Sequence, residues 1–175
     1  GAMRTYVSQG NAKQVKYIFR PTIQLGYRFN NYLSIRYKAY MGGYAPSLAE
    51  LSDVEQHIDI YQIRRGNPNL QAVKFFSNEL SISVGTKYIS AEWFTRYSYD
   101  DKPYMEETTY SNGFYVRSYA NQRGFHRLNS QINLKVQPWK DYMSIQLTPF
   151  VNRYISNGNT YTYTHTNWGL RANLM

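Results

Sequence analysis

The feature that most constrains the fold is a two-residue alternation of apolar and polar side chains along almost the whole chain. Between Leu33 and Met41 the odd positions are Leu, Ile, Tyr, Ala and Met, whereas the even ones are Ser, Arg, Lys and Tyr. Successive side chains of a β-strand point to opposite faces of a sheet, so this period predicts strands with one apolar and one polar face. We expect seven strands that pair in chain order as an all-β, antiparallel meander: Val15–Phe29, Leu33–Met41, Phe76–Gly85, Ile89–Tyr99, Leu128–Val136, Met143–Asn152 and Trp168–Leu174.

The connections between these segments alternate in length. Short turns are predicted at Asn30-Asn31, at Gly85-Thr86-Lys87 and around Pro138-Trp139-Lys140-Asp141. Long connections cover 42–72, 100–115 and 154–160. Short turns on one side and long loops on the other are typical of outer-membrane β-barrels.

Charged and aromatic residues favour a membrane barrel over a soluble sandwich. Within the strands, Lys and Arg fall on the polar face, and the exceptions, Lys74 and Arg153, lie towards the long loops. This is expected of a barrel wall, since a charge that faces lipid at mid-depth costs roughly 2–4 kcal/mol. Aromatic residues gather beside the short turns, as in an interfacial girdle: Tyr27, Phe29, Tyr32, Tyr88, Trp139 and Tyr142.

A soluble β-sandwich also alternates, because one face of each sheet packs in a core and the other meets water. With 19 tyrosines, the alternative is a tyrosine-rich carbohydrate-binding module that stacks sugars on exposed rings. The formal charge of +9 also raises nucleic acid as a partner. Because the basic residues lie on the polar face of the strands, we expect them to face a lumen, and we expect no nucleic acid.

The length of 175 residues suits a single domain. We expect residues 1–3 to be the remnant of a cleaved tag and 4–175 to form one barrel segment. No apolar run approaches the ~20 residues of a membrane helix. The absence of cysteine excludes a disulfide scaffold and a zinc–thiolate site.

The first long connection carries the most specific motifs. "YAPSLAEL" (Tyr44 to Leu51) is followed by "RGNPNL" (Arg65 to Leu70) and by a strand, "FFSNELSISVG". This succession resembles the barrel of TonB-dependent outer-membrane receptors, most closely the Bacteroidetes-type members. Where that family usually continues Lys-Pro-Glu, this chain has Gln71-Ala72-Val73. The residues that match the motifs are Ala45, Pro46, Ser47, Leu48, Leu51, Gly66, Asn67, Pro68, Asn69, Leu70, Glu79 and Leu80.

The resemblance implies a nutrient receptor in the bacterial outer membrane that binds and imports a glycan, a peptide or a metal chelate. Its implied partners are outer-membrane lipid, the rest of the barrel with its plug, and an energy-coupling complex of the inner membrane. Plugged receptors have about 22 strands, so we expect the chain to be a segment of a longer receptor. The ending Asn173-Leu174-Met175, in place of a terminal aromatic residue, supports the same expectation. The loop and lumen candidates for ligand contact are Tyr40, Tyr44, Arg64, Arg65 and Arg96.

Local patterns give further expectations. Ser47 and Glu50 form a capping box, which predicts one or two helical turns. The three histidines show no metal-ligand spacing, and the acidic stretch from Asp100 to Glu107 lacks a calcium-loop pattern. No nucleophile or phosphate-loop motif is present, so we expect neither an enzyme nor a cofactor.

Two carboxylates on the polar face, Glu79 and Glu92, are placed to face each other across a hairpin. Arg36, Lys38 and Arg96 offer balancing charge nearby, so we expect structural ion pairs here and not acid–base catalysis.

In isolation, a barrel segment has two open edges and an uncovered apolar face. We therefore expect it to roll up or to associate with copies of itself. Rolling up would bury the apolar face in a core of Leu33, Ile35, Leu80, Ile82, Ile132, Leu134, Ile145 and Leu147.

Overall fold

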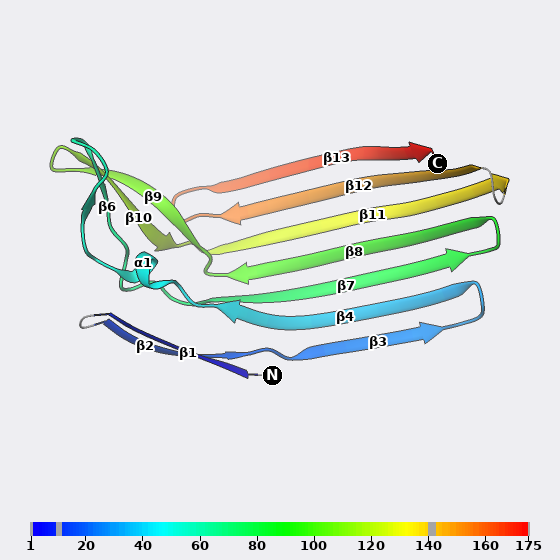
Figure 1. Cartoon of the computed structure of the whole chain (residues 1–175), viewed down its shortest axis with the longest axis horizontal. Helices are drawn as coiled ribbons and strands as arrows, with labels where there is room; N and C mark the ends of the chain where they lie inside the picture. Colours follow the sequence, from blue (N-terminus) through cyan, green and yellow to red (C-terminus); the bar gives the residue numbers. More distant parts are fainter. Residues whose placement is uncertain (1, 10–11, 140–142, 175) are drawn as a thin grey trace.

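A seven-stranded antiparallel sheet forms most of the molecule (Figure 1). The computed structural model describes residues 2–9, 12–139 and 143–174, with side chains for 18–138 and 143–174. The main sheet has the order β13-β12-β11-β8-β7-β4-β3, so its strands pair with their chain neighbours and the predicted meander is confirmed. Its strands are β3 (Thr22–Arg28), β4 (Leu33–Tyr44), β7 (Val73–Gly85), β8 (Ile89–Asp101), β11 (Gly124–Trp139), β12 (Met143–Asn157) and β13 (Thr162–Leu174).

The strand register confirms the two predicted faces. One row across the sheet runs from Lys38 through Glu79, Arg96 and Asn129 to Asn152, and its side is the polar face. An adjacent row on the opposite side, the apolar face, contains Ile35, Ile82, Trp93 and Ile132.

Of the predicted aromatic girdle, Tyr27, Phe29, Tyr32 and Tyr88 are exposed beside the short turns. The side chain of Trp139 and the whole of Tyr142 lie outside the described residues.

The main sheet is open, so the expectation that the chain rolls up is wrong. Its edge strands β3 and β13 each pair with one neighbour, and Figure 1 shows a single layer with no second sheet over it. Ile132 is 44 % exposed, and Gln131 and Gln146 are half-buried, so neither face forms a core. A single sheet buries a face only when its edges meet or a second layer covers it, so the residues of the predicted core stay half-buried or exposed. Self-association stays a prediction.

A second sheet lies beyond the loop end of the main sheet (Figure 1). It has the order β5-β6-β10-β9, with β5 at Gln56–His57, β6 at Gln62–Arg64, β9 at Tyr104–Ser111 and β10 at Phe114–Asn121. The predicted long connection after β8 contains regular structure that was not predicted, because β9 and β10 form a hairpin between β8 and β11. In β9 the pairs Glu106-Glu107 and Thr108-Thr109 place the same residue type on both faces of the strand, so no apolar–polar alternation is visible in the sequence. The turn itself had a signal: Asn112-Gly113, with φ of 50° and 85°, is a favoured hairpin sequence.

The N-terminal strand also differs from the prediction. The expected strand Val15–Phe29 is divided into β2 (Ala12–Phe19) and β3, and β2 pairs with β1 (Ala2–Gln9). The break falls at Arg20-Pro21, because proline has no amide hydrogen for a ladder. The backbone of Ala2 and Met3, expected to be tag residues, belongs to β1.

A small core holds the loop end together. Leu51, Ile63, Leu70 and Val73 are each at most 6 % exposed. The helix α1 (Leu48–Leu51) carries the first of them. None of the helical segments in the described residues has the length and hydrophobicity of a membrane-spanning helix.

Candidate functional site

The polar face carries a cluster of charged side chains centred on Glu79. Arg96 of β8 lies directly opposite Glu79 of β7, and its guanidinium is 2.8 Å from the Glu79 carboxylate. Tyr40 of β4 donates a hydrogen bond of 3.3 Å to the same carboxylate. Lys38 is also opposite Glu79, on β4, and its ammonium lies 4.9 Å from the centre of the Tyr40 ring. Two of the predicted ligand-contact residues, Tyr40 and Arg96, therefore meet at one carboxylate.

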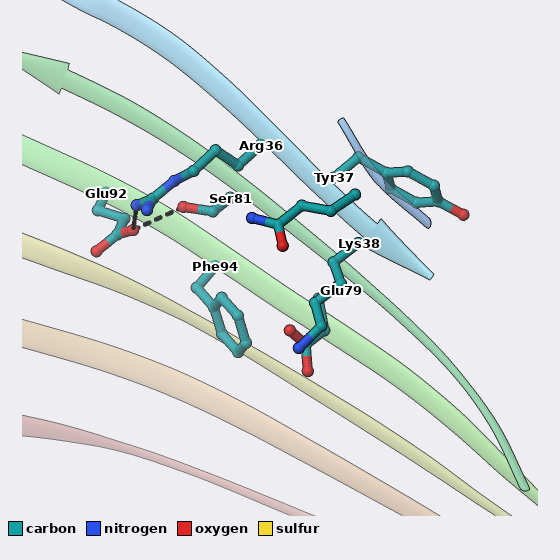
Figure 2. Close-up of a pocket in the computed structure, with 8 residues that line it drawn as sticks. Arg36, Tyr37, Lys38, Glu79, Ser81, Glu92 and Phe94 are labelled. Atoms are coloured by element: carbon teal, nitrogen blue, oxygen red, sulfur yellow. Dashed lines mark hydrogen bonds and ion pairs between the residues drawn. The ribbon is translucent and has the colours of Figure 1, made fainter. Parts of the chain in front are cut away.

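A second cluster lies beside the first and involves Glu92. Its Oε1 accepts a 2.6 Å hydrogen bond from Ser81 and is 3.4 Å from the Arg36 guanidinium, as Figure 2 shows. A hollow of about 220 Å³ is lined by Lys38 and Glu79 of the first cluster, by the three residues of the second cluster, and by Gln24, Tyr37 and Phe94. In Figure 2, Tyr37 points away from this group, towards the other side of the sheet.

The expectation that Glu79 and Glu92 face each other is wrong, because the register pairs Glu79 with Arg96 and Glu92 with Ser83. The expectation of structural ion pairs is confirmed, since each of these carboxylates has its own arginine.

A third ion pair on this face was missed by the sequence interpretation. Arg127 of β11 places NH2 2.8 Å and 2.9 Å from the two carboxylate oxygens of Asp100, and its Nε donates to Ser98. Asp100 is only 6 % exposed. The alternation places both residues on the polar face, but it does not show which cross-strand partners meet.

The motif Gly66-Asn67-Pro68-Asn69-Leu70 is bound to the end of α1 by backbone hydrogen bonds. The amides of Gly66 and Asn67 donate hydrogen bonds of 2.6 Å and 2.7 Å to the carbonyls of Ser52 and Glu50. The Asn67 side chain donates to the carbonyl of Tyr119, and Leu70 is 1 % exposed. Pro46, also from the motif set, is fully buried, whereas Pro68 is exposed.

The predicted capping box is confirmed, and it extends into the loop sheet. Glu50 Oε2 accepts hydrogen bonds from the backbone and hydroxyl of Ser47, and Ser47 Oγ accepts one from the Glu50 amide. Tyr104 donates a further hydrogen bond of 3.2 Å to the same oxygen. Burial of the Tyr104 phenol, together with the negative charge of Glu50, raises the pKa of Tyr104 above its usual value.

The remaining predicted contact residues lie at the loop end, apart from Tyr40 and Arg96. Tyr44 packs edge-on against Tyr104 at 5.8 Å between ring centres, and burial raises its pKa. Arg64 donates to the hydroxyl of Tyr119 at 2.9 Å, whereas Arg65 is 3.5 Å from the Glu55 carboxylate. The structure thus separates the candidates into a group on the polar face and a group among the loops.

Three of the carboxylates in the acidic stretch from Asp100 to Glu107 are engaged in protein contacts. Asp100 pairs with Arg127, Glu106 lies 2.7 Å from Arg117, and Glu107 accepts from Gln122. Within the described residues, no group of three or more His, Asp or Glu side chains is placed to hold a metal ion.

The profile of the outer membrane protein β-barrel family matches residues 5–175. The chain belongs to this family. Membership of this family places the protein in the bacterial outer membrane and excludes the soluble β-sandwich. The described residues also contain no second sheet packed on the main one, as a sandwich would require. A search of curated proteins found no match.

Three solved structures with a similar fold are siderophore or ferric enterobactin receptors. The siderophore receptor PirA of Pseudomonas aeruginosa superposes with a TM-score of 0.64 at 14 % identity, covering 91 % of this chain and 35 % of PirA. The ferric enterobactin receptor PfeA of the same organism, as a G324V mutant, gives 0.61 at 11 % identity, covering 91 % and 28 %. PirA of Acinetobacter baumannii gives 0.56 at 8 % identity, covering 94 % and 35 %.

These similarities establish the fold, and the resemblance to the barrels of TonB-dependent receptors is confirmed at that level. The chain spans about a third of the length of these receptors.

Proposed function

We propose that the chain is part of the barrel wall of a TonB-dependent outer-membrane receptor that binds and imports a nutrient. The observation that carries the proposal is the contrast between the two faces of one open sheet. Ion pairs such as Glu79–Arg96 cover the polar face, whereas apolar side chains such as Ile132 and Leu170 are exposed on the other. In this proposal the polar face lines the lumen and the apolar face meets lipid.

The two sheet edges support the presence of further strands. Within the described part of the chain, β3 and β13 each have one side without a strand partner. Within a bilayer, each unsatisfied backbone amide or carbonyl costs several kcal/mol, so sheets span membranes only as closed barrels. The remaining strands, a plug and an energy-coupling complex are accordingly the proposed partners of this chain.

Among the three proposed ligand classes, the polar face favours an anionic ligand such as a metal chelate over a neutral glycan or a peptide. This face carries more basic than acidic side chains: Arg28, Arg36, Lys38, Arg96, Arg127, Lys135 and Arg171 against Glu79, Glu92 and Asp100. A lumen with this surplus attracts negative charge. The names of the similar structures, a siderophore receptor and a ferric enterobactin receptor, support testing ferric chelates first.

The membrane orientation is testable by single-cysteine labelling, since this chain adds no cysteine and any elsewhere in the receptor can be changed to serine. In the receptor that contains this chain, Asn112→Cys in the β9–β10 turn should react with a membrane-impermeant maleimide on intact cells. Lys87→Cys, in the short turn between β7 and β8, should react only after the outer membrane is opened. Labelling of Lys87→Cys alone on intact cells would contradict the proposed orientation.

The transport function is testable by uptake of a ferric catecholate chelate, an oligosaccharide and a peptide, each radiolabelled. Deletion of 104–121 in the receptor should abolish uptake of the ligand while the barrel still inserts. Full uptake of every ligand class after that deletion would contradict a role for this chain in ligand capture.

A further inference from the structure

An arginine lies on the apolar face near the loop end of the main sheet. Arg153 of β12 is opposite Leu128 on one side and Thr166 on the other. Its side chain is exposed and makes no hydrogen bond or ion pair with another described residue. The other strand arginines of β8 and β11, Arg96 and Arg127, pair with carboxylates on the polar face. An anion that neutralises the Arg153 guanidinium must therefore come from outside the sheet.

Arg153 borders a hollow of about 460 Å³ on this face, lined also by Tyr97, His126, Leu128, Ile155 and Asn157. This volume is within the range of about 300–1,000 Å³ that small-molecule sites occupy. The lining contains no carboxylate, so its only charged group is the guanidinium. The chemistry of the hollow is cationic on one side and apolar on the other.

Aromatic contacts hold the histidine of this hollow in place. The Tyr97 hydroxyl is 2.9 Å from His126 Nδ1, and the Tyr99 ring lies 4.7 Å from the His126 ring between centres. With Nδ1 engaged by Tyr97, Nε2 of His126 has no partner among the described residues. This nitrogen is available to a ligand.

The depth of the hollow matches a membrane interface. Arg153 follows Ile145, an apolar-face residue near the turn end of β12, by eight positions. At about 3.4 Å per residue and a tilt of roughly 35–45°, Arg153 lies about 20 Å further across the membrane. The apolar band of such barrels is about 25 Å tall, so Arg153 is near its loop-side edge. Trp168 on β13, opposite Val151 and 83 % exposed, is at nearly the same level, as expected of an interfacial tryptophan.

We propose that this hollow binds the phosphate of a membrane lipid headgroup in the leaflet on the loop side. Arg153 provides the charge and His126 and Asn157 provide hydrogen bonds, while Leu128 and Ile155 contact the apolar part of the lipid. Guanidinium groups bind phosphate oxygens in pairs, which gives this contact both strength and orientation. The proposal rests on the proposed function, since it requires the apolar face to meet lipid.

The test is native mass spectrometry of the receptor in detergent with phosphatidic acid or phosphatidylcholine added. The unmodified receptor should retain one phosphatidic acid molecule in preference to phosphatidylcholine. Arg153→Gln should weaken phosphatidic acid binding about 10-fold or more, since a hydrogen bond to a charged group is lost. Arg153→Lys should keep most of the preference. Arg171→Gln is the matched control, since Arg171 lies on the polar face of β13 against the ring of Phe150 and should have no effect.

Equal loss in Arg153→Gln and Arg171→Gln, or no loss in either, would overturn the inference. Displacement of the lipid by millimolar inorganic phosphate would instead show a site for free phosphate and would also overturn it. Quenching of Trp168 fluorescence by brominated lipid, with Trp93, Trp139 and every tryptophan elsewhere in the receptor changed to Phe, separates the two proposals. Without quenching, the apolar face does not meet lipid and the proposed function fails; quenching without a phosphatidic acid preference defeats only the lipid site.

Discussion

Replacement of Gly66 by alanine should loosen the first long connection without affecting the main sheet. Gly66 is buried between the end of α1 and the chain that follows β6. A Cβ atom at this position would lie 2.5 Å from the carbonyl oxygens of both Glu50 and Ser52. These are the same oxygens that accept the amides of Asn67 and Gly66. Alanine therefore cannot enter unless both backbone segments separate.

The magnitude follows from those two hydrogen bonds. A net contribution of about 0.5–1.5 kcal/mol each gives about 1–3 kcal/mol for the pair. Local opening of this segment should then be about 5- to 150-fold more frequent. The global stability of the barrel should change little, because Gly66 lies outside the strands of the main sheet.

Hydrogen–deuterium exchange of the receptor, followed on peptides from residues 44–72, measures this opening. The matched control is Gly85→Ala, where the added Cβ would meet only the Ser90 Cβ at an ordinary 3.6 Å. If peptides 44–72 of Gly66→Ala exchange no faster than those of the control, the close approach at Gly66 does not stabilise the loop.

Three further changes test other parts of the structure. Ile132→Lys should lower the free energy of unfolding in lipid vesicles by roughly 2–4 kcal/mol, whereas Gln131→Lys, on the polar face, should be nearly neutral in the same urea titration. Ser47→Ala should destabilise the α1 turn by about 1 kcal/mol, seen as faster amide exchange of that helix. The raised pKa of Tyr104 implies that above about pH 10 only the unfolded loop ionises, so loop stability should fall as pH rises. Tyr104→Phe should weaken this alkaline dependence of loop exchange; an unchanged profile would exclude Tyr104 and its Glu50 contact as the cause.

The sequence was sufficient for the strands of the main sheet and their faces, because both follow from local alternation. The segment from Leu33 to Met41 shows this, since its Ile35 and Arg36 are on the apolar and polar faces as predicted. Two local signals were given too little weight. Pro21 divides the first predicted strand, and Asn112-Gly113 forms the turn of a hairpin that was interpreted as a loop.

Cross-strand partners were not predictable in the same way. Alternation fixes the face of each residue, but a shift of two residues in register keeps every face and changes every partner. The observed turn pairs Gly85 with Ser90, which brings Glu79 opposite Arg96. A turn that shifted the pairing by four residues would have placed Glu79 opposite Glu92 with the faces unchanged. The details of the turn, and not the strand pattern, therefore decide whether the polar face carries ion pairs or repelling carboxylates.

The ion pairs also show where the charge of +9 matters. The three carboxylates on the polar face, Glu79, Glu92 and Asp100, each have an arginine partner within the sheet. Four basic side chains of this face have no ion pair among the described residues: Arg28, Lys38, Lys135 and Arg171. In water such charges are screened within about 8–10 Å, but a closed lumen screens them less. The internal pairing of these strands thus leaves a basic surplus on this face, and under the proposed function an acidic plug surface or an anionic ligand balances it.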